Sequence, residues 1–240
     1  MFEDKLISAL KEYELNYSDE IISNFSDFYK MVIEWNERMN LTAITEEEEF
    51  IAKHILDSLS VIKSMKKYDL LSEDNKILDL GTGAGFPGIP LKIYANNLNI
   101  TLMDALQKRI NFLNEVIKEL RLGNIATLHQ RAEEISQTNL RETFETVLSR
   151  AVAALPTLLE YALPFVKVGG FFIAWKGCKA NEEVELSKNA LKTLGGKITD
   201  IIDVKIPNLN EERALIIVKK DRTTPLKYPR QSGAPKKKPL

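Results

Sequence analysis

The sequence predicts an α/β fold in which a mostly parallel, seven-stranded sheet carries helices on both faces and follows a helical cap. In the first third of the chain, apolar residues recur three and four positions apart, as in Phe25, Phe28 and Val32, which indicates amphipathic helices. From Lys76 onward, strand-like and helix-like segments alternate, as in parallel sheets covered by helices. A glycine-rich turn follows the first strand, at the sheet edge where such folds bind ligands.

The expected elements follow from these two periodicities. The cap helices span residues 3–14, 18–38 and 47–66. The strands span residues 76–80, 99–104, 124–129, 145–151, 169–175, 198–206 and 212–219, with helices near 88–95, 107–121, 155–165 and 180–194. Because only residues 207–211 separate the last two strands, we expect an antiparallel pair at the sheet edge. We expect a cap over residues 1–70, a ligand-binding domain over 71–220 and a basic tail over 221–240 that packs on or near the domain.

Composition excludes several classes of protein. The 240 residues, 44% of them hydrophobic, suffice for one large domain with an appendage. No apolar run approaches membrane-spanning length, and the first residues do not resemble a signal peptide. The single cysteine, Cys178, excludes an intramolecular disulfide. We therefore expect a cytoplasmic protein, monomeric, with no membrane partner and no metal site.

Charge is segregated along the chain. Residues 1–75 hold 8 Lys and Arg against 17 Asp and Glu, residues 76–218 hold 17 against 16, and residues 219–240 hold 8 against 1. A basic end of this kind is typical of nucleic-acid binding, although a solvated tail has the same composition.

The glycine-rich turn, Asp79-Leu80-Gly81-Thr82-Gly83-Ala84-Gly85, predicts a nucleotide-like cofactor. Residues 83–88 also match the dinucleotide pattern G-x-G-x-x-G, so NAD(P) stays an alternative, as does a plain turn with helix-capping acids. Asp79 would repel a pyrophosphate but suits a ligand with an ammonium and a sulfonium, and the stretch resembles motif I of S-adenosylmethionine-dependent methyltransferases. Asp104, after the second strand, stands where an acid accepts hydrogen bonds from ribose hydroxyls.

The other strand ends supply further candidates. Ala132 and Glu133 follow the third strand, where methyltransferases hold adenine, although Glu133 could equally cap a helix. Arg150 ends the fourth strand and could bind a phosphate or a purine edge, or form a salt bridge with a nearby acid. Trp175 and Lys176 end the fifth strand and suit base stacking with a phosphate contact, although Trp175 could be a core residue. The fourth strand lacks the Asn/Asp-Pro-Pro-aromatic motif of amine methyltransferases.

Taken together, these motifs resemble a known family. They are Asn40-Leu41-Thr42, His54-x-x-Asp57-Ser58, the glycine loop extended by Phe86-Pro87-Gly88, Ser149-Arg150-Ala151, and Tyr228-Pro229-Arg230-x-x-Gly233-x-Pro235. Over nearly the whole chain they resemble the small-subunit ribosomal RNA guanine-N7 methyltransferases, also called the glucose-inhibited division protein B family. The resemblance implies a Rossmann-like class I methyltransferase that uses S-adenosylmethionine to methylate N7 of one guanosine in 16S rRNA near the decoding centre.

The resemblance also assigns the expected site. From the resemblance, the cofactor residues would be Gly81, Phe86, Asp104, Ala132, Glu133 and Arg150, and the glycine-rich turn adds Asp79, Gly83 and Gly85. The expected RNA-binding residues are Lys108, Arg109, Arg131, Lys176, Arg222 and Arg230. N7 of guanine carries a free lone pair, so no general base is needed, and Arg150 and His54 are the expected substrate-positioning residues. A methyltransferase acting on another RNA position, a protein or a metabolite, and a non-catalytic RNA-binding module, stay as alternatives.

Overall fold

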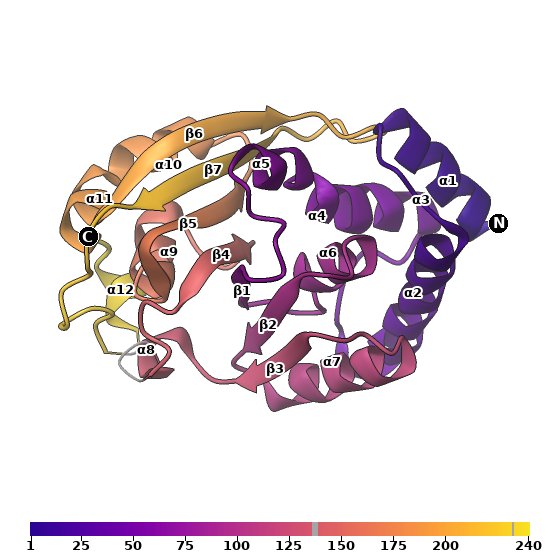
Figure 1. Ribbon diagram of the computed structural model, residues 1–240, viewed down its shortest axis with the longest axis horizontal. Coiled ribbons are helices and arrows are strands. Elements are labelled where there is room, and N and C mark those ends of the chain that lie inside the picture. Colours follow the sequence, from indigo (N-terminus) through magenta and orange to yellow (C-terminus); the bar gives the residue numbers. More distant parts are fainter. Residues whose placement is uncertain (136–138, 232) are drawn as a thin grey trace.

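The sheet of the protein has the order β3-β2-β1-β4-β5-β7-β6. The computed structural model describes residues 1–135, 139–231 and 233–240, and within these residues seven strands form one sheet (Figure 1). The strands are β1 (Lys76–Leu80), β2 (Asn99–Asp104), β3 (Ile125–His129), β4 (Phe144–Arg150), β5 (Val166–Lys176), β6 (Gly196–Val204) and β7 (Arg213–Lys220). β7 runs antiparallel to both β5 and β6, and the other pairs are parallel. The predicted α/β class and the antiparallel pair are confirmed, with β6 at the edge and β7 inside it.

Helices cover both faces of the sheet. One face is covered by α6 (Gly88–Tyr94) and α7 (Gln107–Glu119), and the cap helices pack on these two. On the opposite face α9 (Leu155–Ala162) lies against β5, and around it lie α8 (Ala132–Ile135), α10 (Ala180–Leu186), α11 (Lys188–Leu194) and α12 (Ala234–Lys237). No helix in the described ranges is long and apolar enough to span a bilayer.

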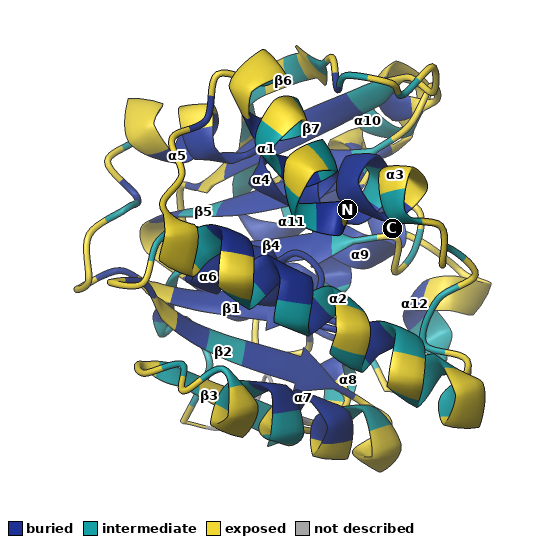
Figure 2. Ribbon diagram, turned by 90° about the vertical axis from the view of Figure 1, so that its right-hand side faces the viewer, coloured by how far each residue is buried: buried dark blue, intermediate teal, exposed yellow. Residues whose placement is uncertain are grey.

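The side chains of the strands contribute alternately to two hydrophobic cores, one on each face of the sheet. Neighbouring residues of a strand point to opposite faces, so Ile77 joins the cluster under the cap, whereas Leu78 joins the cluster under α9. Ile173 and Phe172 divide in the same way on β5. The inner strands β1, β2, β4 and β7 are accordingly buried on both faces over most of their length, whereas the edge strands β3 and β6 keep exposed residues. The covering helices keep one exposed side each (Figure 2).

The cap shares its core with the sheet. It begins with α1 (Phe2–Glu12) and α2 (Asp19–Met39), and the Ser18 hydroxyl accepts a hydrogen bond from the Ile21 amide at the start of α2. Phe28 of α2 packs against Phe86, which follows the glycine loop, with 5.5 Å between the ring centroids. The cap is thereby fixed to the segment that follows the first strand.

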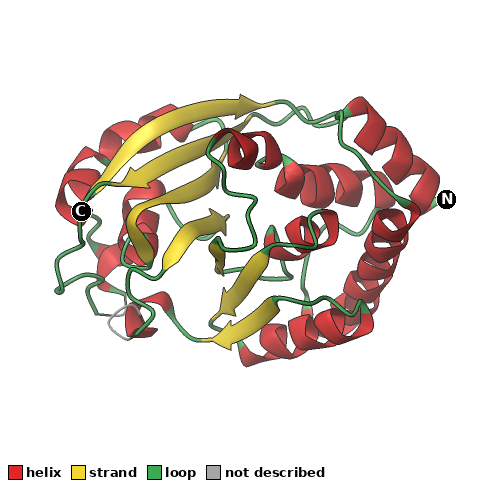
Figure 3. Cartoon of the chain, viewed as in Figure 1, coloured by secondary structure: helices red, strands yellow, loops and turns green. Residues whose placement is uncertain are grey.

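Two expected helices are divided in the structure (Figure 3). The helix predicted over 47–66 consists of α3 (Glu47–Phe50), a π-helical segment η1 (Ile51–Leu56), α4 (Asp57–Leu59) and α5 (Ile62–Lys67). The helix predicted over 180–194 is interrupted at Ser187, whose hydroxyl donates to the Glu183 carbonyl and competes with the backbone ladder. Strand β5 begins at Val166, three residues before its predicted start.

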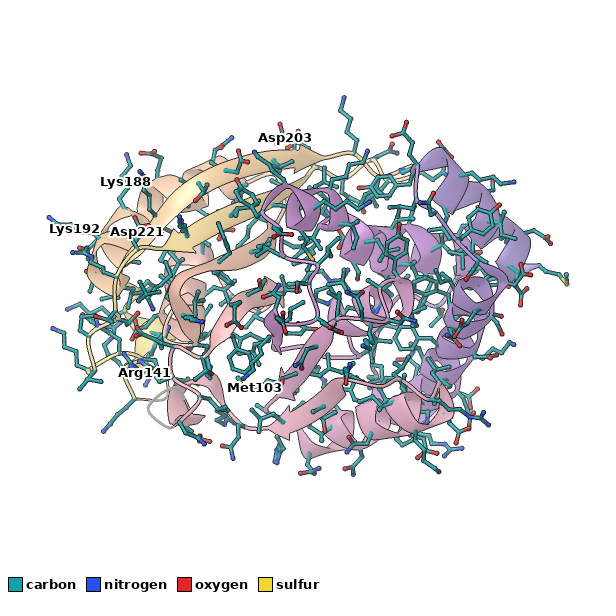
Figure 4. All side chains as sticks on the ribbon, in the orientation of Figure 1. Met103, Arg141, Lys188, Lys192, Asp203 and Asp221 are labelled. Carbon is teal, nitrogen blue, oxygen red and sulfur yellow. The ribbon has the colours of Figure 1, made fainter. Side chains whose placement is uncertain are left out.

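The C-terminal tail is bound to the domain by partly buried polar contacts. Arg141, labelled in Figure 4, donates to the carbonyl oxygens of Thr224 (2.6 Å) and Tyr228 (2.9 Å). Farther along, Arg230 forms a two-pronged ion pair with Glu160 of α9, whose carboxylate is fully buried. The tail therefore runs along α9 as part of the folded structure.

Candidate functional site

The carboxyl ends of β1 and β4 mark the point at which the strand order reverses, since β1 has β2 on one side and β4 on the other. Two hollows open at this edge. The glycine-loop hollow, about 200 Å³, is lined by residues that include Gly81, Asp104, Ala132, Glu133, Val152 and Tyr161. The arginine hollow, about 390 Å³, is lined by residues that include Lys53, His54, Asp57, Arg150, Trp175 and Arg213. Ala151 lines the arginine hollow and Val152 lines the glycine-loop hollow, so the end of β4 forms the wall between them.

The Asp79 carboxylate stabilises the glycine loop by accepting hydrogen bonds from both ends of it. Its Oδ2 accepts hydrogen bonds from the Thr82 hydroxyl (2.6 Å) and the Gly88 amide (2.8 Å). Its Oδ1 is buried and has no hydrogen-bond partner among the described residues. Burial is the main cause that raises the pKa of Asp79 to about 6. A buried carboxylate with one free oxygen suits a cationic ligand at this position.

The conformation of the loop requires glycine at several positions. Gly81 has φ +73°, and a Cβ there would lie 2.6 Å from Cγ2 of Val152. Gly83 has φ +62° and open space where its Cβ would be, so the backbone is accessible at this point. The amides of Gly81 and Thr82 both donate to the carbonyl of Met103 at the end of β2 (Met103 is labelled in Figure 4). Gly85, also at positive φ, donates to the Thr82 carbonyl and completes the turn.

Asp104 joins the second strand to this loop. Its Oδ2 accepts from the Gly83 amide (3.0 Å) and from Nη1 of Arg109 (3.1 Å), and its Oδ1 accepts from the Leu106 amide (2.9 Å). The expected ribose contact stays a prediction, because Asp104 lines the glycine-loop hollow while its carboxylate also fixes the loop. Arg109, expected at RNA, is ion-paired here.

Ala132 and Glu133, at the start of α8, line the glycine-loop hollow together with Gly81. Tyr161 of α9 forms a hydrogen bond with Glu133, and burial followed by the Glu133 charge raises the pKa of the Tyr161 hydroxyl. No sequence pattern indicated Tyr161, because it reaches the hollow from a helix on the far face of the sheet.

Arg150 is the centre of the arginine hollow. Its Nη1 donates to Oδ2 of Asp57 (2.7 Å) and to the Lys53 carbonyl (2.9 Å), and its Nη2 contacts Nδ1 of His54 (3.2 Å). The guanidinium carbon lies 5.1 Å from the centroid of the Phe86 ring. Of the expected roles of Arg150, the salt bridge to a nearby acid is therefore present, and the guanidinium organises the hollow from within.

His54 is buried and held in one tautomer. Because the Arg150 group is only a donor, Nδ1 of His54 accepts, so Nε2 carries the proton and donates to the Thr42 hydroxyl (2.8 Å). Its ring stacks on Phe86 at 4.2 Å between centroids. Burial, and secondly the Arg150 charge, lower the pKa of His54 to about 3. His54 is thus neutral at physiological pH and has no free lone pair for a proton.

The structure corrects the expectations for the end of β5. Trp175 is 5% exposed and its indole N–H donates to the Asp57 carbonyl (2.8 Å), so the core interpretation holds, while base stacking on the part of Trp175 that lines the arginine hollow stays a prediction. The Lys176 ammonium is bound by the Ala153 carbonyl (2.6 Å) and by Glu183 (2.8 Å). Lys176 therefore anchors the segment after β4 and is not available to RNA.

The remaining predicted residues divide by exposure. Arg230 is taken up by its ion pair with Glu160, so we no longer expect it to contact RNA. Lys108, Arg131 and Arg222 are exposed. Phe86 is 6% exposed, and its ring packs against Phe28, Phe50 and His54, so its side chain supports the site from below.

Asp57 and Arg213, which form an ion pair in the arginine hollow, are among its lining residues that were not expected at the site. Asp57 stands three positions after His54, a spacing that places both side chains near one another on a helix. This spacing is the sequence feature that could have indicated Asp57 as a site residue. Arg213 comes from the start of β7 and lies with Nε 3.7 Å from Oδ1 of Asp57. No local pattern indicates this contact, because it joins segments 156 positions apart. Groups of His, Cys, Asp and Glu that could hold a metal ion are absent from the described residues.

Comparison with known proteins gives a consistent result. The family model described as rRNA small subunit methyltransferase G matches residues 21–215. A protein named Ribosomal RNA small subunit methyltransferase G from Acetivibrio thermocellus is 50% identical over 236 residues, 98% of this chain and 95% of its own. Its namesake from Lachnoclostridium phytofermentans is 50% identical over 235 residues, 98% of this chain and 96% of its own.

Among solved structures, a SAM dependent methyltransferase from Aquifex aeolicus shares the fold, with a TM-score of 0.51, 18% identity, and coverage of 68% of this chain and 92% of that one. The match of the family model and the near-complete alignment with these relatives agree with the glycine loop and the strand order. The chain belongs to the rRNA small subunit methyltransferase G family.

Proposed function

We propose that this protein is an S-adenosylmethionine-dependent methyltransferase that methylates N7 of a guanosine in 16S rRNA of the small ribosomal subunit. The observation that carries the proposal is a combination of two neighbouring features. Oδ1 of Asp79, a buried carboxylate oxygen without a hydrogen-bond partner among the described residues, lies at the glycine loop. In the adjacent arginine hollow, His54 is held as a neutral hydrogen-bond donor. The first feature fits a cationic cofactor, and the second fits an acceptor that has no proton to lose.

The residues of the glycine-loop hollow fit S-adenosylmethionine, which supplies an electrophilic methyl group when bound. Oδ1 of Asp79 would take the ammonium, Asp104 the ribose hydroxyls, and Ala132 with Glu133 the adenine edge. Asp79 gains a partner for a buried charge in this way, which is worth more than the same contact at the surface. NAD(P) is disfavoured because its pyrophosphate would meet this carboxylate.

The arginine hollow lies on the other side of the wall formed by Arg150–Val152 and would hold the guanine. N7 carries an unprotonated lone pair, so its methylation releases no proton and the purine becomes positively charged. Arg150 and His54 position the acceptor by fixing the floor of the hollow. They contact one another, Arg150 also donates to Asp57, and Nε2 of His54 is bonded to the Thr42 hydroxyl. The site therefore acts by orientation and by tolerance of the developing charge.

The wider surface supports binding to RNA phosphates. Lys108, Arg131, Arg222 and Lys227 are exposed, and Lys236–Lys238 add a basic end. We infer that the protein acts as a monomer in the cytoplasm on rRNA, and that these cations hold the nucleic acid across the two hollows.

Methyl-acceptor screening tests the proposal. Purified small subunits lacking the modification, protein-free rRNA and a total protein extract are incubated with methyl-labelled S-adenosylmethionine. Label is expected in the rRNA, at a guanosine where borohydride and aniline cleave the chain, a treatment specific for N7-methylated guanosine. Asp79→Ala should abolish most transfer. Label confined to the protein extract, or calorimetry showing binding of NAD but not of S-adenosylmethionine, would refute the assignment.

A further inference from the structure

Two buried side-chain oxygens or nitrogens among the described residues lack a hydrogen-bond partner, and both are carboxylate oxygens at the site. Oδ1 of Asp79 lies below the glycine loop, next to Leu80 and Gly81 of the glycine-loop hollow, and the proposed function assigns it the ammonium of the cofactor. Oδ1 of Asp57 belongs to the arginine hollow, where the proposed function has assigned it no partner. Leaving a buried acceptor unsatisfied is costly, so such an atom at a ligand site indicates a donor on the ligand.

The Asp57 carboxylate is held so that Oδ1 accepts no hydrogen bond from the described residues. Its carboxylate is 5% exposed, and Oδ2 is bound by Arg150 at 2.7 Å. Arg213 approaches Oδ1 with Nε at 3.7 Å, which is within ion-pair range but too long for a hydrogen bond. The backbone is fixed as well, since the Asp57 carbonyl accepts from the Trp175 indole.

We propose that Asp57 reads the Watson–Crick edge of the target guanine by accepting its N1–H and N2–H groups. The inference rests on the proposed function and names the residue that selects the base. Guanine presents two adjacent donors on this edge, whereas adenine presents an acceptor at N1, so a carboxylate favours guanine and rejects adenine. N7 lies on the opposite side of the purine and is left free to face the wall between the hollows. The side chain of Arg213, 27% exposed, lies beside Oδ1 and gives way as the base enters.

The test uses the full-length protein and 16S rRNA or reconstituted small subunits that carry either guanosine or inosine at the mapped target position. Inosine keeps N7 and N1–H but lacks the N2 amino group. The wild-type protein is expected to methylate the guanosine substrate at least about tenfold more efficiently in kcat/KM, the effect of removing one hydrogen bond to a charged acceptor. Asp57→Asn replaces one carboxylate oxygen with a donor while the other can still accept from Arg150, so its guanosine-to-inosine ratio should fall towards one.

Two controls separate recognition from folding. Asp57→Asn should bind S-adenosylmethionine as the wild type does, because Asp57 does not line the glycine-loop hollow. Asp200→Asn changes an acid paired with Lys67 and Tyr68 at the edge strand, far along the sheet from the site, and should keep the wild-type ratio.

The outcomes are distinct. Equal wild-type rates on guanosine and inosine, or a ratio that Asp57→Asn leaves unchanged, would overturn the role of Asp57 while the proposed function stands. Absence of any methyl transfer to guanosine-containing rRNA would overturn the proposed function and this inference with it. A ratio that disappears in Asp57→Asn and is kept in Asp200→Asn would establish Asp57 as the base-reading residue.

Discussion

We expect Asp79 to couple the binding of a cationic ligand to proton release. Its pKa, raised to about 6 by burial, means that the folded protein holds the proton more tightly than the unfolded chain. The stability contributed by this proton is therefore present below the ordinary pKa of an aspartate and is lost as the pH rises through about 6. An ammonium next to Oδ1 favours the ionised form and opposes that shift.

We predict that the affinity for S-adenosylmethionine rises between about pH 5 and pH 7, by at most about tenfold per pH unit, as Asp79 loses its proton. Isothermal calorimetry in buffers of different ionisation enthalpy measures both the affinity and the released proton. Asp79→Asn should bind more weakly and lose this dependence. Methylthioadenosine, which lacks the ammonium, serves as the matched ligand. A pH dependence shared by both ligands would assign it to another group.

The locked tautomer of His54 predicts the pH profile of the reaction. With a pKa of about 3 and Nδ1 engaged by Arg150, His54 does not titrate near neutrality. We expect single-turnover rates at saturating rRNA to be nearly constant between about pH 6 and 9, in contrast to general acid–base catalysis. His54→Ala should lower the rate without adding or removing a kinetic pKa. A rise through the usual histidine pKa that disappears in His54→Ala would contradict this.

Among these residues, the sequence predicted those that are neighbours along the chain. Asp79 and the glycines form one contiguous turn, so their joint role follows from local spacing. The pairing of Arg150 with Asp57 crosses 93 positions and depends on how the cap folds over the sheet. The misjudged cations, Lys176 and Arg230, have tertiary partners that composition does not reveal.

The π-helical segment η1 brings the cap into the lining of the arginine hollow through Lys53 and His54. Its wider turns, with the Asp57 amide bonded five residues back to the Ala52 carbonyl, alter the backbone ladder in this stretch. Carbonyls here accept side chains from elsewhere, as the Lys53 carbonyl does from Arg150 and the Asp57 carbonyl from Trp175. A regular helix over the same residues would present these groups differently, so the irregularity connects the cap to the ends of β4 and β5.

This connection predicts a large effect of a conservative change. Arg150→Lys keeps the charge but cannot reach Asp57, the Lys53 carbonyl and His54 from one planar fork. We expect a decrease of about 1–3 kcal/mol in the free energy of unfolding in urea, together with reduced methyl transfer. Arg38→Lys, in an exposed pair with Glu34 on α2, is the matched control and should change stability by less than about 0.5 kcal/mol. Equal changes in the free energy of unfolding for Arg150→Lys and Arg38→Lys would show that the planar guanidinium of Arg150 makes no specific contribution to stability.

The strands were predictable to within three residues because each is an apolar run bounded by polar turns. The helix expected over 47–66 was not, since a six-residue π-helical segment shows no periodicity that differs clearly from an α-helix. The position of β7 between β5 and β6 could not be predicted either. β6 and β7 are consecutive strands and would pair with one another whether β6 or β7 lay at the edge of the sheet, so their sequence pattern does not show which of them is the edge strand.

For the protein as a whole, the tail combines a structural part with a part that faces solvent. Arg230 neutralises the fully buried Glu160, so deleting residues 222–240 would leave an unpaired charge in the core and destabilise the fold. Changing the exposed Lys227, Lys236, Lys237 and Lys238 to glutamine avoids this. We predict that the fourfold variant shows a flatter dependence of rRNA affinity on salt, with a log–log slope that is shallower by about 0.7–0.9 for each RNA phosphate that the protein no longer neutralises.

Filter binding from low to moderate salt measures this slope. S-adenosylmethionine affinity should not change, because none of the four lysines lines the glycine-loop hollow. The exposed Lys11 and Lys66 of the cap, changed to glutamine, provide the control and should leave the slope as it is. A slope that is unaffected in the tail variant would place the RNA on another face.

The two chain ends lie at opposite ends of the long axis of the molecule (Figure 1). Since residues 1–75 carry the excess of acidic groups and residues 219–240 the excess of basic ones, the nearly neutral protein has a large electric dipole moment along this axis. In the field of a polyanion, such a dipole experiences a torque that turns the basic end inward before contact. A net charge of −1 would give little attraction by itself, so orientation during the approach, rather than overall charge, would set how often a collision with rRNA presents the correct face.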